Sequence, residues 1–161
     1  MKTLDEYYAK HAREIYAYIY SFCYNKELCE EVVQDTFYQA YISIHSLDAT
    51  NLRAWLYRTA YSKFIDSTRK SKRIQLQEPD FFTNYLIEPN FEGQFIKEEE
   101  VKTVFKKIND LPLNQKQALL LSTIHKLSYQ EIATILEITE SSVKSLIFRA
   151  RTTLRNNQME E

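Results

Sequence analysis

Hydrophobic side chains recur along this chain at helical spacing, in separate runs divided by polar breaks. In the first half the runs cover Leu4–Tyr24, residues 27–45 and residues 52–69. Asn25-Lys26 separates the first two runs, and a polar connection separates the second from the third. Three helices are therefore predicted here. The inner face of the second is predicted to carry Cys29, Val33, Thr36, Phe37, Ala40 and Ile44.

In the second half, the pattern indicates a helix from about Glu98 to Asp110 and another capped by Asn114. Two short helices then follow across a turn at Glu137-Ile138. Ser128 and Glu131 have the spacing of a capping box, and Thr139 can cap the second of these helices. The predicted buried side of that helix is Val143, Ile147, Ala150 and Leu154.

The last two helices have the pattern of a helix-turn-helix, although an ordinary helical hairpin would share it. Charge favours DNA binding: residues 141–155 contain four cations and no acid, while the whole chain has a net charge of -1. The residues predicted to meet duplex DNA are Ser128 and Tyr129 on the first helix and Glu140, Ser141, Ser142, Lys144, Ser145, Phe148, Arg149 and Arg151 on the second.

Positive charge is also concentrated between Arg53 and Arg73, a stretch that contains seven cations and a single acidic residue, Asp66. Aromatic side chains lie among these cations, an arrangement suited to gripping phosphates and stacking on exposed bases. Trp55 and the tyrosines would equally well fill a core, and for Trp55 the core is the favoured interpretation.

Composition narrows the fold class to all-α. The 161 residues include one Gly and three Pro, which disfavours turn-rich β folds. We expect two small helical domains, residues 1–73 and 98–161, joined by a flexible linker over residues 74–97. The linker is acidic, which fits a solvated tether of no specific role, while its aromatic side chains favour a segment that also docks on a surface.

Other features exclude several functions. No membrane-length apolar run or signal peptide is present, so we expect a cytoplasmic protein without direct membrane insertion. With Gly93 as the sole glycine, no phosphate-cradling glycine loop can form, and no catalytic cluster, metal site, cofactor site or small-molecule substrate is predicted. Cys23 and Cys29 are expected to be reduced thiols at a helix–helix contact.

Three stretches resemble two domains of a known family. The sequences ELCEEVVQDTFYQAYISI and RAWLYRTAYSKFIDSTRKSKR resemble domain 2 of bacterial extracytoplasmic-function sigma factors. The sequence LPLNQKQALLLSTIHKLSYQEIATILEITESSVKSLIFRARTTLR resembles domain 4 of the same family. This resemblance implies a non-enzymatic subunit that binds core RNA polymerase and directs promoter recognition, DNA melting and transcription initiation.

The resemblance also implies a role for individual residues. Core polymerase would contact Glu31, Gln34, Asp35 and Tyr38. The promoter element near minus ten would be met by Ser46, Asp48, Asn51, Arg53, Arg58, Tyr61, Ser62, Lys63, Arg69, Lys70 and Arg73, with the loop from Ser46 to Asn51 capturing a flipped base. The helix from Thr139 to Leu154 would read the element near minus thirty-five.

Three departures from the family pattern affect promoter choice more than fold. Tyr61-Ser62 replaces a frequent Arg-Asn pair, and Leu146 replaces a frequent Arg. Glu137 stands where Gly is common, which implies either backbone strain or a different turn.

The resemblance further implies an anti-sigma partner that masks the DNA surfaces, and that could hold the protein at a membrane. The alternative is a stand-alone helix-turn-helix regulator with an N-terminal oligomerisation module. Co-purification with core polymerase separates the two functions.

Overall fold

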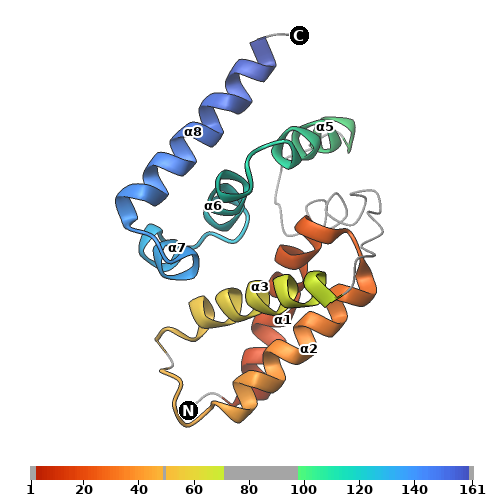
Figure 1. The fold of residues 1–161 in the computed structure, drawn as a ribbon, viewed down its shortest axis with the longest axis vertical. Helices are drawn as coiled ribbons and strands as arrows, with labels where there is room; N and C mark the ends of the chain where they lie inside the picture. The colour runs from red at the N-terminus through yellow and green to blue at the C-terminus, as the bar shows by residue number, and fades with distance from the viewer. Residues whose placement is uncertain (1–2, 49, 71–97, 160–161) are drawn as a thin grey trace. The chain divides into compact units, whose positions relative to one another are not determined.

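The computed structural model describes residues 3–48, 50–70 and 98–159, and the chain divides into two compact units, Met1–Glu78 and Pro79–Glu161. Every regular element in the described residues is a helix (Figure 1). The first unit contains α1 (Leu4–Cys23), α2 (Lys26–Ile42) and α3 (Leu52–Lys70). The second contains α5 (Glu98–Asn109), α6 (Leu113–Thr123), α7 (Tyr129–Leu136) and α8 (Glu140–Met159). No described helix is both long and apolar enough to cross a bilayer.

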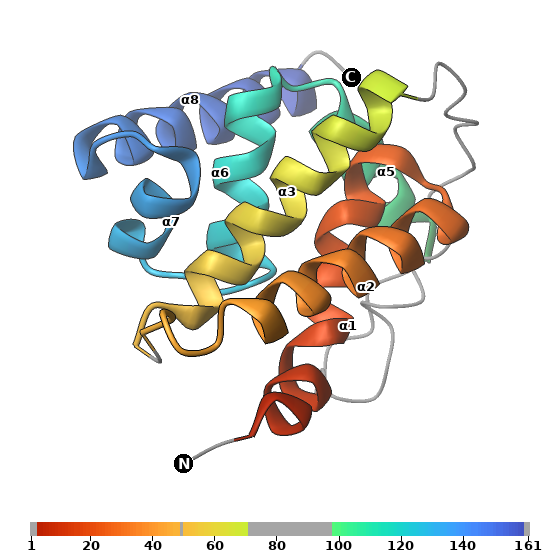
Figure 2. The same ribbon diagram turned by 60° about the horizontal axis from the view of Figure 1, so that its bottom comes forward.

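In the first unit, each of the three helices packs against the other two (Figure 2). Thr3 and Glu6 form a capping box that begins α1, and Asn25 caps α2 by accepting a hydrogen bond from the Leu28 N–H. Such caps each contribute about 1 kcal/mol. The fully buried side chains at the centre come from all three helices and include Ile15, Tyr18, Ile19, Val32, Leu56 and Tyr57.

A cluster of aromatic rings joins α1 to α3. Tyr18 makes edge-to-face contacts with Phe22 and Tyr57, at centroid separations of 5.0 and 5.2 Å. Phe22 in turn contacts Tyr61 at 5.5 Å and Phe64 at 6.0 Å. These aromatic residues of α3 therefore belong at least partly to the core, which is one of the two roles that the sequence predicts for them.

The two cysteines meet where α1 turns into α2. Their sulfur atoms lie 3.6 Å apart as free thiols, and both residues are fully buried. Tyr24 makes the turn between them with a left-handed backbone, at φ 50°. The hydrogen bond with Cys23 and burial both raise the pKa of the Cys29 thiol, so its nucleophilic thiolate form is disfavoured. The expected helix–helix contact is confirmed.

The prediction that Ile44 lies in the core of the second helix is wrong. α2 ends at Ile42, three residues earlier than predicted, and the side chain of Ile44 is 43% exposed. Ser43 leaves the helical conformation at ψ 8°, and the chain turns through a Ser46 N–H to Ser43 carbonyl hydrogen bond. Ile44 consequently falls outside the helical repeat that would have directed it inward.

In the second unit, α8 packs against α5, α6 and α7. The prediction that Asn114 caps α6 is wrong, because the helix already begins at Leu113 with Pro112 at the N-cap position and no side-chain cap. Proline suits that position, since its missing N–H is one of those left unpaired at a helix start. The core under the last two helices includes Ala118, Leu120 and Leu121 of α6.

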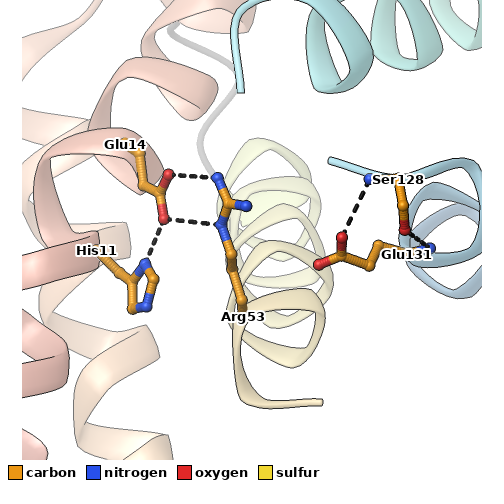
Figure 3. A network of polar contacts seen from close by, with 5 residues as sticks. All are labelled: His11, Glu14, Arg53, Ser128 and Glu131. Atoms are coloured by element: carbon orange, nitrogen blue, oxygen red, sulfur yellow. Dashed lines mark hydrogen bonds and ion pairs between the residues drawn. The ribbon is translucent and has the colours of Figure 1, made fainter. Parts of the chain in front are cut away.

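The predicted start of α7 is confirmed. Ser128 Oγ accepts from the Glu131 N–H at 3.1 Å, and Glu131 accepts from the Ser128 N–H at 3.0 Å (Figure 3). Thr139 Oγ1 accepts from the Ser142 N–H at 3.1 Å and so caps α8, as predicted. On α8, Val143, Ile147 and Ala150 are buried, while Leu154 is only half-buried.

Glu137 makes the turn between α7 and α8 in the left-handed conformation, with φ 58° and ψ 44°. Its N–H and that of Ile138 both point to the Ala133 carbonyl, which ends α7. A residue with a Cβ is less stable than glycine in this conformation by about 1–2 kcal/mol. The position at which Gly is common in the family thus has a positive φ in this chain, with Glu in place of Gly.

We expect Glu137→Gly to stabilise the second unit by about 0.5–1 kcal/mol. Removal of the Cβ relieves the backbone strain at this turn, and the greater entropy of glycine in the unfolded chain offsets part of that gain. Glu137→Ala is the matched control, because it removes the same carboxylate and keeps the Cβ. Hydrogen exchange of the α7 and α8 amides measures the change. Equal exchange rates in the two variants would mean that the backbone at this turn is not strained.

Candidate functional site

One face of α2 is exposed along its whole length. Glu31, Gln34, Asp35 and Tyr38 follow one another at helical spacing and are all exposed. Tyr41 and Ile42 continue the same face one turn further, with exposed fractions of 65% and 57%. The sequence analysis missed these two, although their spacing from Tyr38 would have revealed them. We call the six residues the α2 face. Large exposed apolar side chains next to carboxylates are typical of a protein-binding surface.

A hollow of about 230 Å³ lies between α1 and α2, beside the α2 face. Gln34 lines it together with Val33 and Glu30 of α2 and Tyr8 and Tyr16 of α1. The ring of Tyr8 also packs edge-to-face on Phe37, at 4.9 Å. The hollow therefore continues the exposed surface from α2 onto α1.

Polar groups of the described residues between α2 and α3 hydrogen-bond to one another. Asp48 Oδ1 accepts from the Thr50 N–H at 3.0 Å, and this hydrogen bond lowers the pKa of Asp48. The Asp48 carbonyl accepts from the Asn51 N–H at 3.1 Å, and the Asn51 carbonyl accepts from the Trp55 N–H at 2.9 Å. Ser46, Asp48 and Asn51 are exposed, and we call these three residues the α2–α3 loop.

The predicted DNA residues on α3 differ in their surroundings. Arg58, Ser62 and Arg69 are exposed, and Lys63 is half-buried. The ring of Tyr61 lies against Phe22 and Phe64, which leaves only part of it accessible. Lys70 is the last residue of α3, and Arg73 lies outside the described residues.

Arg53 has an intramolecular partner that the sequence analysis did not anticipate. Its guanidinium donates from Nε to Glu14 Oε1 at 3.2 Å and from Nη2 to Glu14 Oε2 at 2.9 Å (Figure 3). His11 Nδ1 also contacts Glu14 Oε1, and the Arg53 guanidinium carbon lies 5.9 Å from the centre of the Tyr57 ring. Arg53 is half-buried, and its contact with DNA stays a prediction.

Glu14 is the acceptor at the centre of this network, and its side chain is only 16% exposed. Burial would raise the pKa of Glu14, but the hydrogen bonds with His11 and Arg53, together with the positive charge of Arg53, lower it to about 2. The carboxylate is thus ionised at neutral pH, and it ties α1 to the first turn of α3.

The second unit presents the predicted outward face of α8. Glu140, Ser141 and Ser142 stand at the helix start and are exposed, as are the residues further along, Lys144, Ser145, Phe148, Arg149 and Arg151. Phe148 is 69% exposed, the largest value among the exposed large hydrophobic residues described. On α7, Ser128 is exposed and Tyr129 is half-buried. Small polar groups at the start of a helix, followed by cations, suit insertion into the major groove.

Within the part of the chain that the structure describes, no group of three or more His, Cys, Asp or Glu side chains is placed to hold a metal ion. The candidate surfaces are thus two exposed helix faces, one loop and one basic helix. They offer contacts to macromolecules.

Two family models match the chain. Residues 7–74 match sigma-70 region 2, and residues 104–154 match sigma-70 region 4. The first match covers the α2 face, the α2–α3 loop and α3, and the second covers the helix-turn-helix.

Whole-chain comparisons agree with these matches. The chain is 34% identical to the ECF RNA polymerase sigma factor SigM of Bacillus subtilis (strain 168), over 95% of this chain and 93% of that protein. It is 31% identical to SigW of the same organism, over 85% and 81%.

Two solved structures share the fold. The sigma factor RpoE in complex with the anti-sigma factor NepR from Bartonella quintana has a TM-score of 0.72 at 22% identity, covering 94% of each chain. CnrH in complex with the cytosolic domain of CnrY has a TM-score of 0.70 at 22% identity, covering 98% of this chain and 88% of that one. With region 2 in its first helical unit, region 4 in its second and a full-length likeness to SigM, the chain belongs to the ECF RNA polymerase sigma factors.

Proposed function

We propose that the α2 face is the surface through which this sigma factor docks on core RNA polymerase. The observation that carries the proposal is the continuous exposure of Glu31, Gln34, Asp35 and Tyr38 on one helix face, extended by Tyr41 and Ile42. Carboxylates at such a surface steer a basic partner and fix its orientation, while the aromatic rings supply buried area on contact.

The promoter would be engaged at two places. The α2–α3 loop and the exposed residues of α3, Arg58, Ser62 and Arg69, would meet the melted element near minus ten, with Lys63 beside them. The exposed residues of α8 would meet the duplex element near minus thirty-five. Phe148 is suited to contact a thymine methyl group, since it is apolar and lies among the polar residues of that face.

An anti-sigma factor is part of this proposal. Both structural neighbours with the same fold are complexes, one with the anti-sigma factor NepR and one with the cytosolic domain of CnrY. A comparable partner would cover the DNA surfaces of this chain in the cytoplasm. If that partner were bound to a membrane, it would hold the chain at the membrane. Acidic segments would suit such a partner, because the surfaces to be covered carry Arg58, Arg69, Lys144 and Arg149.

The experiment that tests the function is run-off transcription from a genomic library with holoenzyme reconstituted from purified chain and core polymerase. We expect the two proteins to co-purify in equal amounts and to initiate at a defined set of promoters with DNA melting. A chain that binds an operator by itself and does not retain core polymerase would contradict the proposal.

Arg149 provides a test of the minus-thirty-five surface. We expect Arg149→Ala to weaken promoter binding by holoenzyme, and to reduce the slope of log affinity against log salt by about 1, because one phosphate contact is lost. Lys106→Ala, which removes an exposed cation of α5 in the same unit, should leave the slope unchanged. An unchanged slope in the Arg149 variant would mean that Arg149 meets no phosphate.

A further inference from the structure

Glu14 lies on α1, outside every surface assigned above, yet it is the acceptor in the most fully connected polar network shown in Figure 3. Both of its oxygens receive a nitrogen of Arg53, and one also contacts His11. Two parallel bonds between a carboxylate and a guanidinium fix orientation as well as distance. A single hydrogen bond would fix the distance but not the orientation of the guanidinium.

Arg53 is the second residue of α3 and therefore directly follows the α2–α3 connection. Two backbone hydrogen bonds run in series from that connection into the helix, from the Asn51 N–H to the Asp48 carbonyl and from the Trp55 N–H to the Asn51 carbonyl. The start of α3 thus forms one hydrogen-bonded unit with Asp48 and Asn51 of the loop, whereas Ser46 is hydrogen-bonded to Ser43 at the end of α2. Holding Arg53 in place on α1 holds this unit in place too.

We propose that Glu14 is a positioning residue for promoter recognition: by clamping Arg53, it fixes the α2–α3 loop in the geometry that discriminates between bases at the melted element. The inference rests on the proposed function of that loop. It adds a residue of α1 that touches no DNA and acts through Arg53. The loop residues are exposed, so we expect the position of Asp48 and Asn51 to depend on the anchor at the start of α3 to which they are hydrogen-bonded.

A purely stabilising role for Glu14 would have a different consequence. Loss of domain stability lowers the amount of active holoenzyme and affects all DNA sequences alike. Loss of loop position instead reduces the preference for one base over the others. The ratio of affinities for different bases therefore separates the two roles, whereas a melting temperature does not.

The test uses holoenzyme and forked DNA based on a promoter selected in the run-off experiment. Each position of the melted element is replaced by all four bases and by an abasic site, to find the position at which the α2–α3 loop discriminates. At that position, we expect Glu14→Gln to reduce discrimination between the preferred base and the others by on the order of tenfold, since a small misplacement of a binding group has effects of up to about a hundredfold. Affinity for the abasic DNA should stay unchanged.

Two further variants keep the test decisive. Val32→Ala opens a cavity in the core of the same unit without touching the network, and at a matched loss of stability it should retain full discrimination. Arg53→Lys keeps the charge but loses the two-pronged contact, and it should reduce discrimination as Glu14→Gln does. If the Glu14→Gln variant does not fold, discrimination between bases by the Arg53→Lys variant tests the same inference.

The inference is overturned if Glu14→Gln and Arg53→Lys discriminate as well as the unmodified chain, or if Val32→Ala loses discrimination to the same degree. Failure of the proposed function would look different. In that case, the unmodified chain itself would show no base preference or would not assemble with polymerase.

Discussion

Asp35→Arg is expected to abolish binding to core RNA polymerase while leaving the fold intact. Asp35 is exposed in the middle of the α2 face, with Glu31 and Tyr38 one turn to either side. Reversal of its charge would place a cation against the basic surface that the acidic α2 face is proposed to meet, and like charges at an interface cost several kcal/mol. Such a cost lowers the affinity by at least about a hundredfold.

The measurement is co-purification with core polymerase at increasing salt, with circular dichroism to verify the helices. Asp110→Arg serves as the control, because it makes the same change in net charge at an exposed turn of the second unit. Normal retention of Asp35→Arg, or equal loss in both variants, would show that the α2 face is not the docking surface.

Glu14 is expected to make the stability of the first unit decrease as the pH falls below about 4.5. The pKa of Glu14 in the folded chain is about 2, below its ordinary value of 4.5. A carboxylate with a lowered pKa stabilises the fold above its ordinary pKa, and this contribution is lost as pH falls from about 4.5 through about 2. The difference corresponds to about 3 kcal/mol, which is a large share of the stability of a small domain.

Denaturation by urea at several pH values measures this dependence. Trp55, the single tryptophan of the chain, lies on α3 and reports on the first unit. The difference in free energy of unfolding between the unmodified chain and Glu14→Gln should shrink by about 3 kcal/mol between pH 5 and pH 2. A difference that does not change with pH would mean that the Glu14 carboxylate is not held ionised by His11 and Arg53.

Local sequence signals account for most of the fold. The capping box of Ser128 and Glu131 and the cap at Thr139 were predicted from spacing alone, because each pairs groups three residues apart. Errors occurred at helix ends. Asn114 is a good capping residue by type, but α6 begins at Leu113, with Pro112 at its N-cap position. α2 ends at Ile42, so Ile44 lies beyond the helix although its spacing fits the apolar repeat.

The exposed candidate residues were predictable for a similar reason, since helical spacing determines which side chains share a face. The α2 face and the outward side of α8 follow from that periodicity, although their proposed contacts remain to be tested. The Glu14–Arg53 contact could not be predicted in this way. The two residues are separated by 39 positions, and only the packing of α3 on α1 brings them together. Arg53 in the sequence is indistinguishable from the cations that follow it.

Division of the proposed DNA surfaces between two units is compatible with the chain's net charge of -1. Each basic face alone would bind DNA weakly and with strong salt dependence. Attachment of both units to one polymerase would make engagement of the second promoter element intramolecular and raise its effective concentration. Selectivity would then belong to the holoenzyme.

Footprinting on one selected promoter, with and without core polymerase, tests this account most directly. We expect protection of both promoter elements and strand opening only when core polymerase is present, and loss of both when about half a helical turn of DNA is inserted between the elements. Equal protection of the same DNA by the chain alone would contradict the account.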